Sequence, residues 1–183
     1  MAINKFKTTQ ESQIEISVLM LPSHANFGGK IHGGYILSLM DQIAFGCASK
    51  HSGNYCVTAS VDKVNFLNSI EVGELVTMKA SVNYVGNSSM EIGIRVEAEN
   101  IQNGIKKHCN SSYFTMVAVN DNGKTIAVPG LKITSKMDAK RFIKAIKRRE
   151  SEIKKDKVLG EIYKNVDEHL ELLQDYRVEI SFK

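Results

Sequence analysis

The spacing of apolar residues changes twice along the chain, and each change indicates a different secondary structure. Apolar and polar residues alternate over 12–20, which predicts a short strand before Pro22, and apolar residues repeat at helical intervals over 35–49. From residue 56 onward the period is two, which predicts strands over 57–62, 76–84, 90–97 and 113–119. The chain is therefore expected to form one strand, then one helix, then four further strands.

Turn residues separate the later strands, among them Gly86, the pair Asn103-Gly104, and Gly123. Such short links favour antiparallel neighbours, because a parallel crossover needs a dozen residues or more. The helix over 35–49 is apolar on nearly all sides, so we expect it to be buried against this single sheet. The pattern predicts an α+β fold in which one long buried helix is wrapped by a curved antiparallel sheet. The edges of that sheet make self-association an expectation as well.

Charge divides the chain into a neutral body and a polarised C-terminal part. Residues 1–130 hold ten basic and ten acidic side chains, whereas residues 131–183 supply the whole net charge of +4. Within that part, residues 132–157 carry a net +7 and residues 158–183 a net −3. Helical periodicity returns on both stretches, with a break expected near 155–157. We therefore predict a domain over 1–130 and a charged C-terminal helical extension over 131–183.

The composition predicts a globular protein of the cytoplasm. Apolar residues make up 43% of the 183 residues, which excludes wholesale disorder, and no apolar run approaches the roughly 18 residues of a membrane helix. No apolar stretch follows the first lysines, so we predict no secretory signal. The three cysteines, Cys47, Cys56 and Cys109, are odd in number and widely spaced, as expected in a reducing compartment.

Asp41 is the first candidate for chemistry. It is the only formal charge between Lys30 and Lys50, and it lies within the helix that we expect to be buried. A lone buried carboxylate costs several kcal/mol unless it is paired or used. Asp41 is therefore either a catalytic group or a structural carboxylate bonded to a facing Ser or Thr.

The residues His32, Gly33 and Gly34 mark the start of that helix. Free N–H groups in a first helical turn can stabilise a developing oxyanion, and glycines let a ligand approach the backbone closely. A plain tight turn would use the same glycines. Asn26, just upstream, can form a hydrogen bond to a carbonyl or a water molecule.

The spacing between Gly34 and Asp41 bears on the assembly. Seven residues are two helical turns, so both lie on one helix face, about 10 Å apart along the axis. That distance is too long for both to touch one reacting carbonyl within a chain. If two such helices ran antiparallel across a twofold axis, Gly34 of one chain would meet Asp41 of the other. We therefore expect a homodimer with two shared sites.

Residues 24–41 resemble the N-x-x-G-x-x-x-G-G-x(6)-D/E signature of hotdog-fold acyl-CoA thioesterases. They are most similar to the branch of YciA-like and brain-type acyl-CoA hydrolases. The likeness covers roughly residues 12–130 and continues through 57–61, 65–67, 72–74 and 86–90. The resemblance implies a hotdog fold, which agrees with the order of one strand, one helix and four strands.

The resemblance also implies hydrolysis of a fatty acyl-CoA thioester to free acid and coenzyme A, with no metal and no other cofactor. By position, Asp41 would act as general base or as nucleophile, and Thr58 would support its carboxylate. The amide of Gly34 at the helix N-terminus would form the oxyanion hole, and Asn26 would orient water or substrate.

Substrate contacts are implied for four further residues. His32 and Gly33 would contact the substrate at the start of the helix, and Ser88 and Ser89 match a turn that contacts coenzyme A in relatives. His32 stands where many relatives have phenylalanine, so it is either a second titrating group or only part of the turn. Because trimers of dimers are common in the family, a hexamer is a further expectation beside the homodimer.

Other chemistries have little support in the sequence. The histidines form no i, i+4 pair and no C-x-x-C motif is present, so no metal site is predicted. Cys47 falls inside the helix and is expected to pack rather than react. A non-catalytic hotdog protein that binds acyl-CoA is the alternative to an enzyme.

The basic segment over 136–157 allows more than one interpretation. The favoured one is a solvated helix face that docks on the sheet through Phe142 and Ile146. Within the thioesterase hypothesis, its basic side chains would meet coenzyme A phosphates, the candidates being Arg141, Lys144 and Arg148. Contact with nucleic acid is not predicted, because few aromatic residues accompany these charges, and no membrane span is predicted either.

Overall fold

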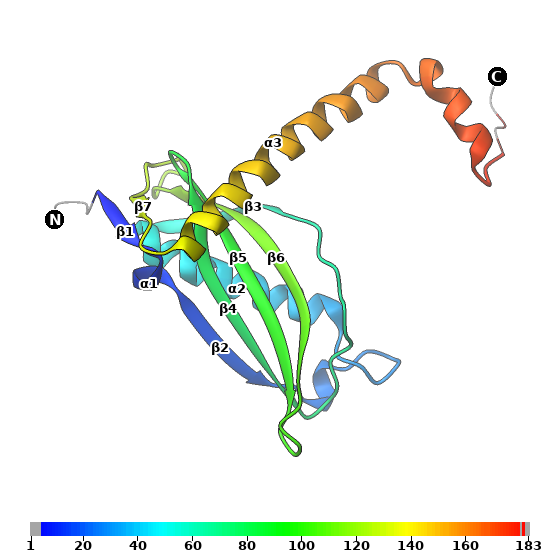
Figure 1. The fold of residues 1–183 in the computed structure, drawn as a ribbon. Coiled ribbons are helices and arrows are strands. Elements are labelled where there is room, and N and C mark those ends of the chain that lie inside the picture. Colours follow the sequence, from blue (N-terminus) through cyan, green and yellow to red (C-terminus); the bar gives the residue numbers. More distant parts are fainter. Residues whose placement is uncertain (1–4, 180, 182–183) are drawn as a thin grey trace. The chain divides into compact units, whose positions relative to one another are not determined.

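The computed structural model describes residues 5–179 and residue 181, and the chain divides into two compact units between Phe142 and Ile143. The first unit contains the long helix α2 (Gly33–Ser52) and a five-stranded antiparallel sheet (Figure 1). The strands are β2 (Ile14–Leu19), β3 (Tyr55–Val61), β4 (Glu74–Val85), β5 (Ser89–Asn100) and β6 (Lys106–Val119). The sheet curls around α2, which confirms the predicted α+β hotdog architecture.

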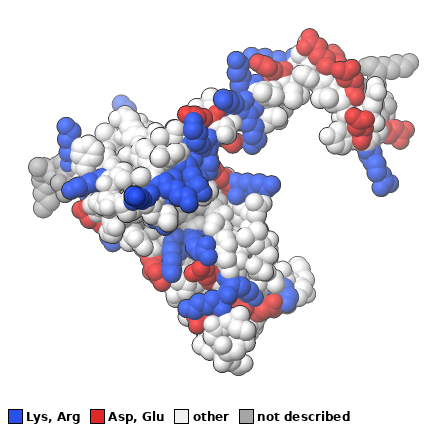
Figure 2. Space-filling view, in the orientation of Figure 1, with Lys and Arg blue, Asp and Glu red and all other residues white. Residues whose placement is uncertain are grey.

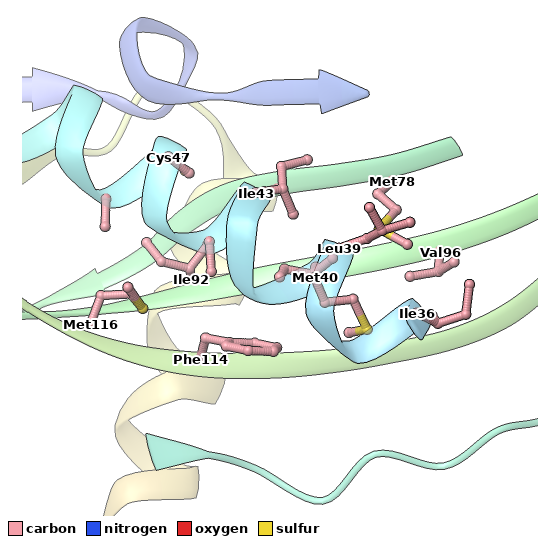
Figure 3. Close-up of a cluster of buried hydrophobic side chains, with 14 of the residues drawn as sticks. Ile36, Leu39, Met40, Ile43, Cys47, Met78, Ile92, Val96, Phe114 and Met116 are labelled. Carbon is pink, nitrogen blue, oxygen red and sulfur yellow. The ribbon is translucent and has the colours of Figure 1, made fainter. Parts of the chain in front are cut away.

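The core lies between one side of α2 and the inner face of the sheet (Figure 3). Every second residue of β4, β5 and β6 points inward, which is the alternation that the sequence predicted. The buried side chains include Ile36, Met40, Ile43, Cys47, Met78, Ile92, Phe114 and Met116. Because each large apolar side chain contributes roughly 1.5–3 kcal/mol on burial, this layer holds α2 firmly in the curl of the sheet.

The strands do not follow one another across the sheet as their short links led us to expect. The order is β2-β4-β5-β6-β3, so β3 pairs with β6 rather than with β4. The expectation holds for β4, β5 and β6, whose hairpins are short, and is wrong for the first link. Residues 62–73 lie between β3 and β4, and this length lets the chain cross from one edge of the sheet to the other.

The long helix is buried on one side only, which corrects the expectation that it would be buried nearly all round. Asp41, Gln42 and Phe45 are exposed in the single chain. The Phe45 ring meets Tyr55 of β3 edge-on, with ring centroids 5.4 Å apart. A five-stranded sheet covers only part of a helix's circumference, so this face of α2 and the edge strand β3 stay open together.

Four short elements were not predicted, because three or four residues carry no readable period. They are β1 (Phe6–Thr8), the helix α1 (Thr9–Ser12), the 3-10 helix η1 (Pro22–His24) and β7 (Gly130–Lys132), and β1 pairs with β7 in parallel. The imidazole of His51, completely buried, joins this region to α2: its Nε2 lies 3.0 Å from the Pro129 carbonyl oxygen and its Nδ1 3.2 Å from Ser12 Oγ. Burial lowers the pKa of His51, so at neutral pH it is an uncharged structural group.

The C-terminal region begins within the first unit. Helix α3 (Lys136–Lys164) starts on the outer side of the sheet, where the rings of Phe142 and Tyr84 lie 5.0 Å apart, as predicted for Phe142. Residues 131–142, which we assigned to the extension, thus belong to the first compact unit.

The second unit contains the remainder of α3 and the 3-10 helix η2 (Val166–Asp175). The break expected near 155–157 is wrong, because α3 continues to Lys164. A change in the sign of charge does not end a helix when no proline or capping glycine accompanies it. Among the described residues, no helix is both long enough and apolar enough to cross a membrane.

Candidate active site

Asp41 and Thr58 meet between α2 and the edge strand β3. The Thr58 hydroxyl donates a hydrogen bond of 2.6 Å to Oδ1 of Asp41. On β3, Thr58 is paired with Met116 of β6, and the Met116 sulfur lies 3.5 Å from the same hydroxyl. Both side chains lie on the face of the sheet that is turned toward the helix. Within the part of the chain that the structure describes, no hydrogen bond reaches Oδ2 of Asp41. The pair therefore fixes the carboxylate and leaves one of its oxygens available.

This pairing explains how Asp41 is held, although its predicted burial is wrong for the single chain. The carboxylate lies on the open face of α2 and is exposed to solvent. A hydrogen bond between a hydroxyl and a carboxylate is charge-assisted, and it restricts the rotation of both side chains. The arrangement suits either of the roles we considered, a structural carboxylate or a catalytic one.

His32 is the cap of α2, a role that the sequence analysis left open. Its backbone is extended, and its Nδ1 accepts a hydrogen bond of 2.9 Å from the amide of Gly34. An ideal Cβ at Gly34 would lie 3.0 Å from the His32 ring, so the imidazole lies directly against this residue. The amide expected to stabilise an oxyanion is thus occupied by a side chain of the same turn.

Gly33 allows the crossing segment 62–73 to pass over the start of α2. A Cβ at Gly33 would lie 3.3 Å from Cζ of Phe66, which is closer than most side chains tolerate. Phe66 itself is half exposed, at 49%, and covers the helix start. Phe66 lies in the segment 65–67 that the resemblance covers, but its contact with Gly33 was not predicted, because it depends on how the long link crosses the sheet.

Asn26 organises the loop that leads into α2. Its Oδ1 accepts hydrogen bonds from the amides of Gly28, at 2.9 Å, and Lys30, at 3.2 Å. Lys30 in turn forms an ion pair of 2.6 Å with Glu71 on the crossing segment. No described residue accepts a hydrogen bond from Nδ2 of Asn26, so this exposed amide group can still donate to another molecule.

Ser88 and Ser89 lie apart from the Asp41–Thr58 pair within one chain. Ser88 lies in the turn between β4 and β5, and Ser89 is the first residue of β5. Ser89 is paired with Val117, which is paired on its other side with Val57. Two strand spacings separate Ser89 from β3, about 10 Å. The backbone carbonyl of Ser88 accepts a hydrogen bond from the amide of Ala118, at 2.9 Å, which fixes the turn.

The remaining candidates for chemistry are not supported. Burial raises the pKa of the Cys47 thiol to about 12, so this residue packs in the core and does not act as a nucleophile. Among the residues that the structure describes, no three His, Cys, Asp or Glu side chains gather as a metal site would require.

Comparison with known sequences identifies relatives along most of the chain. The family model described as "Thioesterase superfamily" matches residues 28–105. Protein VdlD of Helicobacter pylori is 42% identical over 143 residues, which is 78% of this chain and 82% of that protein. The uncharacterized acyl-CoA thioester hydrolase YkhA of Bacillus subtilis is 34% identical over 120 residues, 66% of this chain and 70% of its own. The rat cytosolic acyl coenzyme A thioester hydrolase is 35% identical over 74% of this chain, but the match spans only 36% of that longer protein.

Solved structures give the same result. The chain superposes on an apo-hexameric acyl-CoA thioesterase with a TM-score of 0.80 at 32% identity, covering 82% of this chain and 97% of that one. It superposes on an acyl-CoA hydrolase of Staphylococcus aureus, in complex with butyryl coenzyme A, coenzyme A and coenzyme A disulfide, with a TM-score of 0.76 at 30% identity, covering 87% and 99%. Further structures of the S. aureus enzyme carry alanine in place of one Asn, one Asp and one Thr.

Proposed function

The chain belongs to the hotdog acyl-CoA thioesterases of the thioesterase superfamily, and we propose that it hydrolyses fatty acyl-CoA with Asp41 as the catalytic carboxylate. The observation that carries this assignment is the hydrogen bond of 2.6 Å from Thr58 to Asp41 on the open face of α2. The order Asn26, Asp41, Thr58 has intervals of 15 and 17 residues, the same as the three substituted positions of the S. aureus enzyme.

The free oxygen of Asp41 can perform the reaction in either of two ways. As general base, it takes a proton from water while the water oxygen attacks the thioester carbon. As nucleophile, it bonds to that carbon itself, and water then hydrolyses the resulting anhydride. In both routes the C–S bond breaks and the coenzyme A thiolate takes up a proton. A thiolate leaves readily, so we propose that no metal or other cofactor takes part.

The amide of Gly34 is the proposed oxyanion donor, and His32 competes for it. The positive end of the helix dipole and the absence of a side chain both favour a carbonyl oxygen at this position. Because Nδ1 of His32 already accepts from this amide, the thioester carbonyl must displace the imidazole before it can bind. We therefore propose that the His32 side chain caps the first turn of α2 in the free protein and moves away from the Gly34 amide when substrate binds.

This competition predicts a change in KM without a change in kcat. His32→Phe keeps an aromatic ring but removes the acceptor, so we expect KM for acyl-CoA to fall about fivefold, the equivalent of one helix cap of about 1 kcal/mol. His32→Asn retains an acceptor and should keep the KM of the wild type. His24→Phe is the matched control, because His24 stacks on Tyr35 and leaves the Gly34 amide alone. An unchanged KM in His32→Phe would show that the cap does not compete with substrate.

The contacts of the remaining site residues extend this proposal. Asn26 would orient the water or the thioester carbonyl through its free Nδ2, while its Oδ1 keeps the loop in shape. Gly33 would let the acyl group pass close to the backbone beside Phe66. Ser88 and Ser89 lie too far from Asp41 of their own chain, so we propose that they contact the coenzyme A moiety bound mainly by another subunit.

We propose a homodimer with shared sites, built on the open face of α2 and the edge of β3. Both carry exposed apolar side chains, among them Phe45 at 38%, Tyr55 at 63% and Val57 at 39%. A patch of this kind on an edge strand is typical of a surface that a second chain covers. Gly34 and Asp41 stand two helical turns apart, and a twofold axis is what can bring them together.

We also propose a larger assembly and a location in the cell. Because a superposing thioesterase is hexameric, we propose that three such dimers associate. A cytoplasmic location agrees with the three unpaired cysteines and with relatives named as cytosolic enzymes.

The function is tested by following thiol release from a series of substrates from acetyl-CoA to palmitoyl-CoA. We expect turnover on at least one chain length, and the series identifies the preferred acyl group at the same time. Saturable binding of acyl-CoA without turnover on any chain length would instead favour the non-catalytic alternative, a hotdog protein that only binds acyl-CoA.

A further inference from the structure

The outer face of the sheet, turned away from α2, carries an open cavity of about 210 Å³. Residues of β4, β5 and β6 line it together with Gln13, and Arg141 from the start of α3 completes the wall. Figure 2 views this face, where lysine and arginine side chains gather over the strands and the start of α3. The Asp41–Thr58 pair lies on the inner face, so this cavity is separate from the proposed reaction site of its own chain.

Three cationic side chains, Lys79, Arg95 and Arg141, line the cavity. Arg95 donates to Glu97 at 2.9 Å, and the ammonium of Lys79 lies 3.9 Å from Glu15 and 3.8 Å from Glu97, beyond hydrogen-bond length. Arg141 makes no hydrogen bond and no salt bridge with any residue that the structure describes. Three carboxylates, Glu15, Glu97 and Asp138, interact with these three cations, so the feature that favours an anion is the guanidinium of Arg141, whose donors are all available.

The side-chain amide of Asn83 offers a further donor beside these cations. Asn83 lines the cavity and is only 5% exposed. Its Oδ1 accepts from the hydroxyl of Ser81 at 3.3 Å, but no described residue accepts from its Nδ2. Its side chain packs over Gly93, where a Cβ would overlap the amide. Because Asn83 lines the cavity, its Nδ2 is a donor that a molecule entering from solution can use.

We infer that this cavity binds a small anion that carries a phosphoryl group. A guanidinium fork and an ammonium are the groups that proteins use for phosphate oxygens, and the amide of Asn83 supplies a neutral donor. The volume far exceeds the about 10–15 Å³ that a single water needs, so a phosphate or pyrophosphate group fits. Two sources share this chemistry: the phosphates of coenzyme A, as the sequence suggested for Arg141, and a separate phosphorylated metabolite.

The test is a calorimetric titration of the full chain with pyrophosphate at constant ionic strength. We expect saturable binding that weakens at least tenfold in Arg141→Gln. Lys140→Gln is the matched control, since it removes the same charge from the neighbouring, exposed position of α3 and is expected to bind within twofold of wild type. No saturable binding, or an equal loss in both variants, would overturn the proposal.

A second titration distinguishes the two sources. If free coenzyme A displaces pyrophosphate, and Arg141→Gln weakens both ligands alike, the cavity takes the phosphates of the substrate. If pyrophosphate binds equally well in the presence of saturating coenzyme A, the cavity takes an independent phosphorylated metabolite. Neither titration requires turnover, so the result stands apart from the outcome of the hydrolysis assay.

Discussion

Asp41→Asn is expected to lower kcat for acyl-CoA hydrolysis at least a hundredfold. The amide keeps the size of the side chain but can neither take a proton from water nor attack the thioester carbon. General base catalysis contributes about 10²–10⁴-fold to a rate, and the loss of a nucleophile costs as much or more. The measurement is thiol release at saturating acyl-CoA, with the wild type assayed in parallel.

Two control variants show whether a loss of activity in Asp41→Asn comes from the loss of the carboxylate itself. Thr58→Val removes the 2.6 Å hydrogen bond but keeps the carboxylate charge, so we expect a smaller fall in kcat, about tenfold. Gln42→Ala changes the exposed neighbour on the same helix and should leave kcat within twofold of the wild type. If Asp41→Asn hydrolyses acyl-CoA at the wild-type rate, the chemistry belongs to another residue and our assignment fails.

Mixing two inactive variants is expected to restore activity, because each proposed site takes Gly34 from one chain and Asp41 from the other. Gly34→Pro removes the amide N–H, and proline is tolerated in the first turn of a helix. A dimer of Asp41→Asn with Gly34→Pro keeps one complete site, formed by Gly34 of the first chain and Asp41 of the second. Random pairing of equal amounts makes half the dimers mixed, so about a quarter of the wild-type activity should return.

The mixing experiment needs subunits that pair at random, so the two variants are co-expressed in equal amounts and purified together through one shared tag. Each variant alone should retain the assembly state of the wild type by size-exclusion chromatography while showing at most about 1% of its activity. Mixed dimers that stay as inactive as their parents would place the whole site within one subunit. Because the expected gain is about 25-fold over either parent, the assay separates the two arrangements clearly.

Much of the fold could be predicted from local pattern alone. The period of two over 76–84 and 90–97 predicted β4 and β5 because one face of each strand is buried and the other is not. The glycines at 86, 104 and 123 predicted the turns because two of them adopt a positive φ, and the third, Gly86, could not hold a Cβ beside Ser89. Elements of three or four residues, such as β1 and α1, could not be found this way.

The candidate site was only partly accessible to the same reasoning. Asp41 stood out because it is the single charge in an apolar helix, and the double glycine stood out as a helix start. The resemblance to a known family, and not local physics, pointed to Thr58. The cap that His32 forms and the contact of Phe66 with Gly33 were not predicted, because both depend on how the loop and the crossing segment fold against the start of α2.

The sequence by itself determined which segments form helix and strand, the interval of seven residues between Gly34 and Asp41, and the charge of each part of the chain. These properties depend only on residues that lie close together in the sequence, so each segment shows them by itself. Only the tertiary structure decided that β3 lies beside β6, which brings Thr58 to Asp41 across 17 residues of sequence. It also decided that one face of α2 stays open and that the Gly34 amide is occupied by His32. Strand order and side-chain rotamers follow from packing among distant segments, and no local period records that packing.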